Sequence, residues 1–145
     1  MEIKELGHAV LYVRDLERSR KFYGELLGWR ALGHGPGYAA FGTPRTHHEL
    51  LLLEQPKATP LPPRPRIGLY HLGLKVGDSD DDLRAAKAEL EAADVHIIGM
   101  SDHGVTHSLY LADPDGNELE LYVDVDDSWK TDPSAVLGEI KPLRL

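Results

Sequence analysis

The chain has 145 residues and a mass of 16.1 kDa, enough for one domain with a substantial core. Its 24 acidic residues outnumber its 16 basic ones, and the resulting net charge of −8 argues against a nucleic-acid partner. Cysteine is absent, which excludes disulfides, zinc–thiolate sites, iron–sulfur clusters and thiol nucleophiles. Because no apolar run is long enough to span a bilayer and no signal-peptide pattern opens the sequence, we expect a cytoplasmic protein.

The first predicted unit opens with a strand and a helix. Residues 7–13 form a short β-rich run that predicts a strand. Asp15 is suited to cap the following helix, whose apolar residues recur at helical spacing. Gly28 suits the left-handed position just past the end of that helix. Three further strands are expected at residues 29–32, 38–41 and 47–53.

A second unit repeats this order. A strand is predicted at residues 70–76, followed by a helix whose first turn holds Asp80, Asp81 and Asp82, which favour the positive end of the helix. Three strands follow at residues 96–99, 108–111 and 119–125, the last two joined by the turn sequence Asp-Pro-Asp-Gly at 113–116. His8 and His71 occupy equivalent places in the two opening strands. The sequence therefore predicts an α+β fold with the order βαβββ twice.

The rest of the chain joins or follows these two units. Residues 56–66 contain five prolines, which remove backbone donors and predict a linker. The tail, residues 126–145, matches neither unit. We therefore predict one domain over residues 1–145, with module one at about 5–55 and module two at about 67–125.

Strand alternation places metal-type ligands on matching faces. His8 and His71 lie opposite the apolar positions of their strands, and Glu118 and Glu120 lie opposite the apolar positions of the last strand. The apolar faces are expected to pack against the helices. Two histidines and one carboxylate with open positions suit non-haem Fe(II), and also Mn(II), Ni(II) or Zn(II).

These segments resemble a known family. The opening GHAVLYVRDLERSRKFYGELLGW, the central YHLGLKV and the closing SLYLADPDGNELELYV are similar to motifs of the vicinal oxygen chelate superfamily, which includes glyoxalase I, extradiol dioxygenases and antibiotic-resistance proteins. The resemblance implies two βαβββ modules forming a curved, eight-stranded mixed sheet around one divalent metal. By position, it assigns the metal ligands to His8, His71 and Glu120, and the spacing after Asp-Pro-Asp-Gly favours Glu120 over Glu118.

The class of superfamily member depends on the segment His47-His48-Glu49. In extradiol enzymes a histidine on this strand is the acid–base catalyst, and the resemblance gives that role to His48. In glyoxalase I the same strand donates a fourth ligand, which here would be Glu49. If residues 53–54 align with residues 123–124, His48 matches Glu118 and faces the site. If Glu49 aligns with Glu120, it becomes the fourth ligand.

Two further residues are typical of the dioxygenase branch. Tyr110 lies ten residues before Glu120, where extradiol enzymes place a tyrosine beside the substrate. His103 resembles another active-site histidine of these enzymes, although His107 competes for that assignment.

Three hypotheses follow. The first is an extradiol-type dioxygenase, an oxidoreductase that uses Fe(II) or Mn(II), O₂ and a catechol-like vicinal diol. The second is a glyoxalase- or epimerase-like lyase or isomerase, activated by Ni(II), Co(II) or Zn(II). The third is a metal-free protein that binds a small molecule such as an antibiotic. For each we expect a small-molecule partner, no nucleic acid and no membrane, and a homodimer that completes the pocket.

Overall fold

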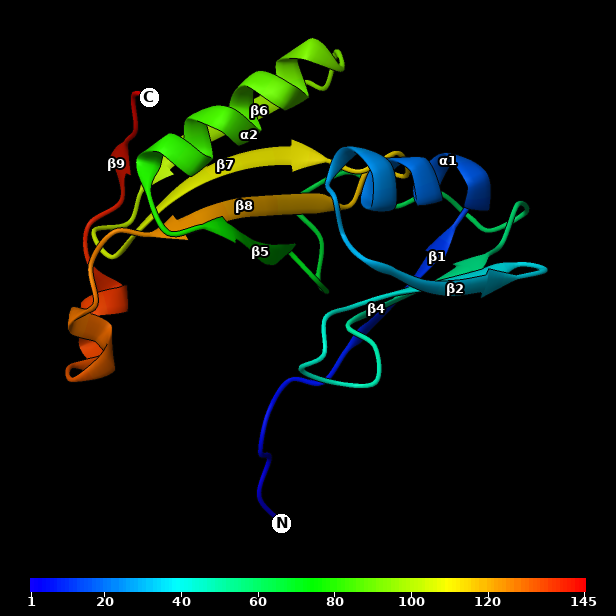
Figure 1. Cartoon of the computed structure of the whole chain (residues 1–145), viewed down its shortest axis with the longest axis horizontal. Helices are drawn as coiled ribbons and strands as arrows, with labels where there is room; N and C mark the ends of the chain where they lie inside the picture. The colour runs from blue at the N-terminus through cyan, green and yellow to red at the C-terminus, as the bar shows by residue number, and fades with distance from the viewer. The chain divides into compact units, whose positions relative to one another are not determined.

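The computed structural model describes residues 1–145, which divide into two compact units, residues 1–62 and 63–145. Both units have the predicted βαβββ order (Figure 1). The first unit contains β1 (Ala9–Val13), α1 (Leu16–Arg20), η1 (Lys21–Leu26), β2 (Ala31–Gly35), β3 (Tyr38–Phe41) and β4 (Leu50–Glu54). The second contains β5 (His71–Gly77), α2 (Asp80–Ala92), β6 (Ile97–Asp102), β7 (Thr106–Ala112), β8 (Glu118–Asp124), η2 (Ser128–Lys130), η3 (Pro133–Leu137) and β9 (Lys141–Pro142).

The first unit is a four-stranded mixed sheet in the order β1-β4-β3-β2. Strands β1 and β4 are parallel, and the other pairs are antiparallel. The Asp15 carboxylate caps α1 by accepting a hydrogen bond from the Arg18 backbone, as predicted. The helix continues as the π-helical turn η1 and ends before Gly28, whose φ of 66° is the left-handed conformation expected there.

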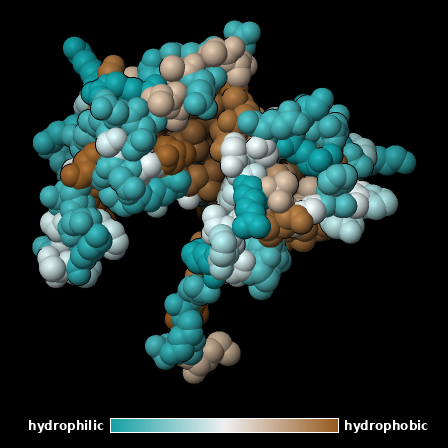
Figure 2. Space-filling model, in the orientation of Figure 1, coloured by the Kyte–Doolittle hydropathy of each residue, from teal (hydrophilic) through white to brown (hydrophobic).

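The second unit is a five-stranded sheet in the order β5-β8-β7-β6-β9. Strands β5 and β8 are parallel, whereas β7 pairs antiparallel with both β6 and β8. Helix α2 covers one face of this sheet, and Figure 2 shows mostly hydrophilic residues along the outward side of that helix. Gly116 has a φ of 86° and donates its backbone N–H to the Asp113 carbonyl, which closes the predicted turn between β7 and β8.

Each unit has its own apolar core between helix and sheet. In the first unit, Tyr23 and Ser19 are fully buried against the helix-facing side of the sheet. In the second, Leu83 and Leu90 of α2 are buried. Most of the other core residues lie on inward strand positions, namely Leu11, Val13, Ala39, Phe41, Leu50, Leu52, Leu109, Leu111, Leu119, Leu121 and Val123. The predicted alternation of buried and accessible positions is therefore confirmed along β1 and β8, with polar residues at the accessible positions of β8.

Some boundaries differ from the prediction. Strand β4 begins at Leu50, not at residue 47 as predicted. Pairing with β3 and β1 starts only at Glu49, whose N–H donates to the Phe41 carbonyl and whose carbonyl accepts from the Ala9 N–H. His47 and His48 therefore lie in the loop before β4. The tail adds the short strand β9, which the sequence did not predict. No helix is both long and apolar enough to cross a membrane.

Candidate active site

Glu120 lies on the face of β8 that is turned away from α2, at the centre of a polar network. Ser108 donates its hydroxyl to Oε1 of Glu120 at 2.7 Å, and the Tyr110 hydroxyl donates to the same oxygen at 3.1 Å. Both donors come from the adjacent antiparallel strand β7, where Tyr110 pairs directly with Glu120. One carboxylate oxygen is thus held by neighbours, and the other, Oε2, remains for a different partner.

His71 supplies that partner from the parallel strand β5. Its Nε2 lies 3.0 Å from Oε2 of Glu120. The other ring nitrogen, Nδ1, is buried and has no hydrogen-bond partner, and its nearest carboxylate oxygen, on Glu118, lies 3.6 Å away. The sheet register explains the approach, since His71 pairs with Glu118 and Gly73, two residues on, pairs with Glu120.

The donors at this point fit a divalent metal. An ion about 2.1 Å from each of two ligand atoms, at roughly right angles, places those atoms about 3 Å apart. His71 Nε2 and Glu120 Oε2 have that separation. A carboxylate whose second oxygen is already hydrogen-bonded is also the usual form of a metal ligand, because outer partners orient it. The second unit therefore holds one imidazole nitrogen and one carboxylate oxygen at a separation that a shared divalent ion would also give.

Glu118 is engaged differently, although it lies on the same face of β8. Its Oε2 lies 3.2 Å from the Arg64 guanidinium, so its negative charge is paired. Arg64 also donates to the backbone carbonyl of Tyr70 and lies over the Tyr70 ring at 4.7 Å. This pairing with a cation favours Glu120 over Glu118 as the carboxylate ligand.

His103 and Tyr110 come together beside Glu120. His103 Nε2 lies 2.6 Å from the Tyr110 hydroxyl and 3.7 Å from Oε1 of Glu120. Burial and the charge of Glu120 raise the pKa of Tyr110 to about 12, so the phenol stays protonated and can donate. His107, the competing histidine, is held elsewhere, with Nδ1 2.6 Å from Asp80.

In the first unit, His8, His47 and His48 form a cluster in which one ring nitrogen from each residue lies within 4.8 Å of the others, close enough to share a metal ion. The His8 and His48 ring centroids are 4.3 Å apart, and Nδ1 of His47 lies 2.6 Å from Nδ1 of His48. Partial desolvation, followed by the charges of His47 and His8, lowers the pKa of His48. His48 Nε2 is buried without a hydrogen-bond partner. His48 is thus a neutral imidazole at neutral pH with an unused nitrogen.

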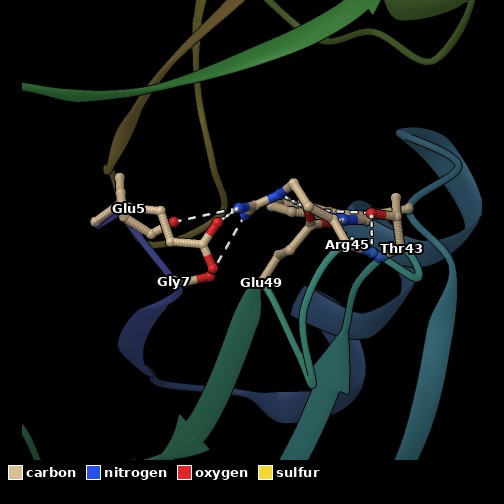
Figure 3. Close-up of polar contacts among 7 residues, drawn as sticks. Glu5, Gly7, Thr43, Arg45 and Glu49 are labelled. Carbon is tan, nitrogen blue, oxygen red and sulfur yellow. Dashed lines mark hydrogen bonds and ion pairs between the residues drawn. The ribbon is translucent and has the colours of Figure 1, made fainter.

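Glu49 has no such unused atom. Its Oε1 accepts from the Thr43 hydroxyl and from Arg45 Nε, while Oε2 accepts from the Thr43 backbone and from Trp29 Nε1. Arg45 reaches on to Glu5 and to the Gly7 carbonyl, so that Glu49 is part of a network that joins the loop before β4 to the segment before β1 (Figure 3). Burial alone would raise the pKa of Glu49, but hydrogen bonds from Arg45, Trp29 and Thr43 lower it.

Strand register defines the internal correspondence that the sequence left open. Ala9 pairs with Leu50 in the first unit, and the equivalent Leu72 pairs with Leu119 in the second. Glu49 therefore corresponds to Glu118, and Leu51 corresponds to Glu120. The two alignments considered from the sequence matched His48 to Glu118 or Glu49 to Glu120, so neither agrees with the observed register.

The family model that matches the chain is "Glyoxalase/Bleomycin resistance protein/Dioxygenase superfamily", over residues 5–121. The chain belongs to this superfamily. It is 38% identical to a protein of Bacillus subtilis (strain 168) named catechol-2,3-dioxygenase, over 85% of this chain and 42% of that protein. It is 32% identical to a protein of Rhodococcus globerulus named biphenyl-2,3-diol 1,2-dioxygenase 2, over 83% of this chain and 63% of that protein. The chain thus spans about half the length of these curated relatives.

Solved structures agree on the fold of the superfamily. A glyoxalase/dioxygenase from Nostoc punctiforme matches with a TM-score of 0.73 and 24% identity, over 85% of this chain and 92% of that one.

Sequence reasoning about this superfamily member missed Ser108, the closest donor to Glu120. The signal was available, because Ser108 and Tyr110 are two residues apart on one strand and therefore share a face. The ion pair between Arg45 and Glu49 was also missed.

Proposed function

We propose that the chain is a metal-dependent extradiol-type dioxygenase that acts on a catechol-like vicinal diol with O₂. One observation carries the proposal: Glu120 is held through Oε1 by Ser108 and Tyr110, while Oε2 lies 3.0 Å from His71 Nε2. That arrangement supplies two of the three ligands of a site with two histidines and one carboxylate.

The proposed ligands are His8, His71 and Glu120. The third ligand, His8, is assigned by its equivalence to His71 in the repeated strand. Such a donor set suits Fe(II), our first choice, ahead of Mn(II), Ni(II), Co(II) or Zn(II). When bound, the metal supplies a Lewis acid for the two diol oxygens and an electron conduit between the diol and O₂.

His48 is proposed as the acid–base residue. Its lowered pKa keeps the imidazole neutral at neutral pH, and its buried Nε2 has no competing partner. A neutral imidazole with a free nitrogen can accept a proton from a diol hydroxyl and later return it to an oxygen of the opening ring.

Tyr110 and His103 are proposed to orient the site. The Tyr110 phenol has a pKa of about 12 and is therefore protonated at neutral pH. It donates a hydrogen bond to Glu120 and so fixes the orientation of the carboxylate. His103, 2.6 Å from the same hydroxyl, can relay or hold a proton on the far side of Tyr110. Both residues are therefore expected to affect turnover more than folding.

The saturation of Glu49 supports a dioxygenase over a glyoxalase-like enzyme. A glyoxalase-type site needs a fourth carboxylate or amide ligand, and both oxygens of Glu49 already accept hydrogen bonds, one from a charged guanidinium. Releasing them for a metal would break several contacts at once, including a charge-assisted bond.

The experiment is anaerobic reconstitution with Fe(II), followed by an oxygen-electrode assay with a panel of catechols. We expect metal uptake, catechol-dependent O₂ consumption and a coloured ring-opened product. The Glu49→Gln variant is the control and should keep the activity. Metal uptake without O₂ consumption, combined with activity on another substrate that Glu49→Gln abolishes, would overturn the proposal in favour of a lyase or isomerase.

A further inference from the structure

The tail, residues 126–145, belongs to neither βαβββ unit but is ordered on the second one. It is fixed at its start by Val125, whose N–H donates to the Val105 carbonyl, and at its end by β9, which pairs with β6. Between these points Asp132 caps η3 by accepting from the Ser134 backbone at 3.0 Å. Figure 1 shows η2 and η3 beyond the end of β8 that leads into the tail.

A cavity of about 280 Å³ lies between this tail and the sheet. The sheet and its adjoining loop contribute five lining residues, and the tail contributes two. The lining residues are Val105, Thr106, Glu120, Tyr122, Asp124, Trp129 and Val136. The cavity therefore includes the proposed metal ligand Glu120 and the tail residues Trp129 and Val136.

The lining of the cavity is mixed. Thr106, Glu120 and Asp124 are polar, whereas Val105, Trp129 and Val136 give it apolar surface. Trp129 and Val136 remain 37% and 56% exposed, so a ligand can still cover apolar surface on both. An aromatic ring suits this surface, because rings stack on or against indole with favourable geometry.

We propose that Trp129 and Val136 receive the part of an aromatic diol that lies remote from the metal, and thereby select the substrate. This inference rests on the proposed function. The cavity is near the lower end of the roughly 300–1,000 Å³ of small-molecule pockets, which suits one ring with a short apolar substituent.

The charges of the cavity sharpen the class of substrate. None of its lining residues is basic, and Asp124 is paired with Lys75 at 2.8 Å. A diol with a carboxylate on its remote part would place that charge against the apolar residues Trp129 and Val136, where no lining residue is basic and the nearby cation, Lys75, is already paired with Asp124. The expected substrate is therefore an uncharged alkyl-substituted catechol, and its carboxylated analogue is expected to bind poorly.

The test uses the full-length chain with Trp29→Phe, which leaves Trp129 as the single tryptophan of the two in the sequence. Anaerobic titration of the Fe(II)-loaded protein with 4-methylcatechol should quench or shift Trp129 fluorescence, while 3,4-dihydroxybenzoate should do so only at much higher concentration. In the oxygen assay, Trp129→Ala and Val136→Ala, each made in the natural sequence, should raise KM for 4-methylcatechol about three- to tenfold with kcat little changed.

Two controls separate binding from folding. Trp129→Phe keeps an aromatic side chain in the cavity and should have a KM close to that of the natural sequence. Leu137 is the chain neighbour of Val136 but is 82% exposed and lies outside the cavity lining, so Leu137→Ala should leave KM unchanged. Turnover with unchanged KM in both alanine variants would overturn this inference and leave the proposed function intact. Fluorescence changes without any O₂ consumption would overturn the proposed function but would still support catechol binding beside Trp129. If no catechol produced either signal, both would be wrong.

Discussion

The two units have the same strand order and the same parallel pairing, yet they differ at the positions where chemistry is expected. In the second unit Glu120 on β8 pairs with Tyr110 on β7. At the corresponding place in the first unit, Leu51 on β4 pairs with Ala40 on β3. One fold is therefore used twice, but the carboxylate and its supporting phenol occur once.

The polar residues of the first unit lie instead at the entry to its strands. His8 precedes β1, and His47 and His48 precede β4, so the cluster belongs to connecting segments. Such segments tolerate functional side chains because their geometry is less constrained by pairing. The comparison teaches that the repeated sheet supplies a frame, while the proposed ligands come from strand positions in one unit and from a strand end in the other.

The largest effect is expected when the carboxylate of the second unit is replaced by leucine, the residue at the corresponding place of the first unit. Glu120→Leu should abolish turnover and reduce metal affinity by more than ~100-fold, since loss of a residue that only supports a ligand already costs ~10–100-fold. Elemental analysis after Fe(II) loading measures the effect. Glu118→Gln, on the same face of β8, is the matched control and should keep the metal. Full metal content in Glu120→Leu would contradict the assignment.

The next effect concerns the histidine cluster of the first unit. His48→Ala should lower kcat by ~10²–10⁴-fold, the usual contribution of a general acid or base, and should leave the metal content unchanged. His47→Ala removes the adjacent ring, which contacts Nδ1 of His48, and should have a smaller effect. Loss of metal in His48→Ala would show instead that His48 is a ligand.

Tyr110→Phe tests the support that only the second unit has. The change removes one of the two hydroxyls that hold Oε1 of Glu120, and we expect a ~10-fold or greater loss of metal affinity or turnover. Tyr12→Phe, on the exposed face of β1, is the control and should match the unchanged protein. Equal kinetics for the two variants would exclude a role for the Tyr110 hydroxyl.

The smallest expected effect is on stability and concerns the helices, because α1 and α2 have different N-terminal capping residues. Helix α1 is capped by Asp15, whereas α2 is capped by Ser79, whose hydroxyl also donates to Asp82 at 2.8 Å. Ser79→Ala should lower the free energy of unfolding by about 1 kcal/mol without changing turnover. Urea denaturation measures this, and an unchanged midpoint would show that the cap is dispensable.

The same cap has a pH dependence of known sign. Hydrogen bonds from Ser79 and from the Asp78 backbone lower the pKa of Asp82. The stabilisation is therefore present above the ordinary pKa of the carboxyl and is lost as pH falls through the lowered value. Asp82→Asn should flatten the decline of stability in acid, and an identical acid profile would contradict the assignment.

The sequence predicted the order of elements because alternation and helical spacing are local properties. Asp15, Gly28 and the turn at residues 113–116 adopt the conformations expected of them. These features depend on neighbours a few residues away in the chain. The closeness of Tyr110 to Glu120 was expected from the family resemblance, and the two residues do pair across β7 and β8.

The features that were missed depend on pairing between distant segments. The start of β4 is set by backbone bonds from Glu49 to Ala9 and Phe41, and a shift of one residue exchanges the faces of every side chain. Alternation within one strand cannot show how many residues the preceding loop absorbs, so the match of Glu49 to Glu118 was not predicted. The saturation of Glu49 by Arg45 likewise depends on a loop conformation.

Strand β9 has a consequence beyond the cavity. It pairs Lys141 and Pro142 with Asp102 and Ser101 of β6, which would be the outer strand of this sheet without β9. An uncovered outer strand presents free backbone donors and acceptors on which another chain can add, the route by which sheets aggregate. A two-residue strand that ends in proline, which has no N–H to offer, covers the Ser101–Asp102 end of β6 without creating a new edge of equal length. The end of the tail thus discourages self-assembly at β6.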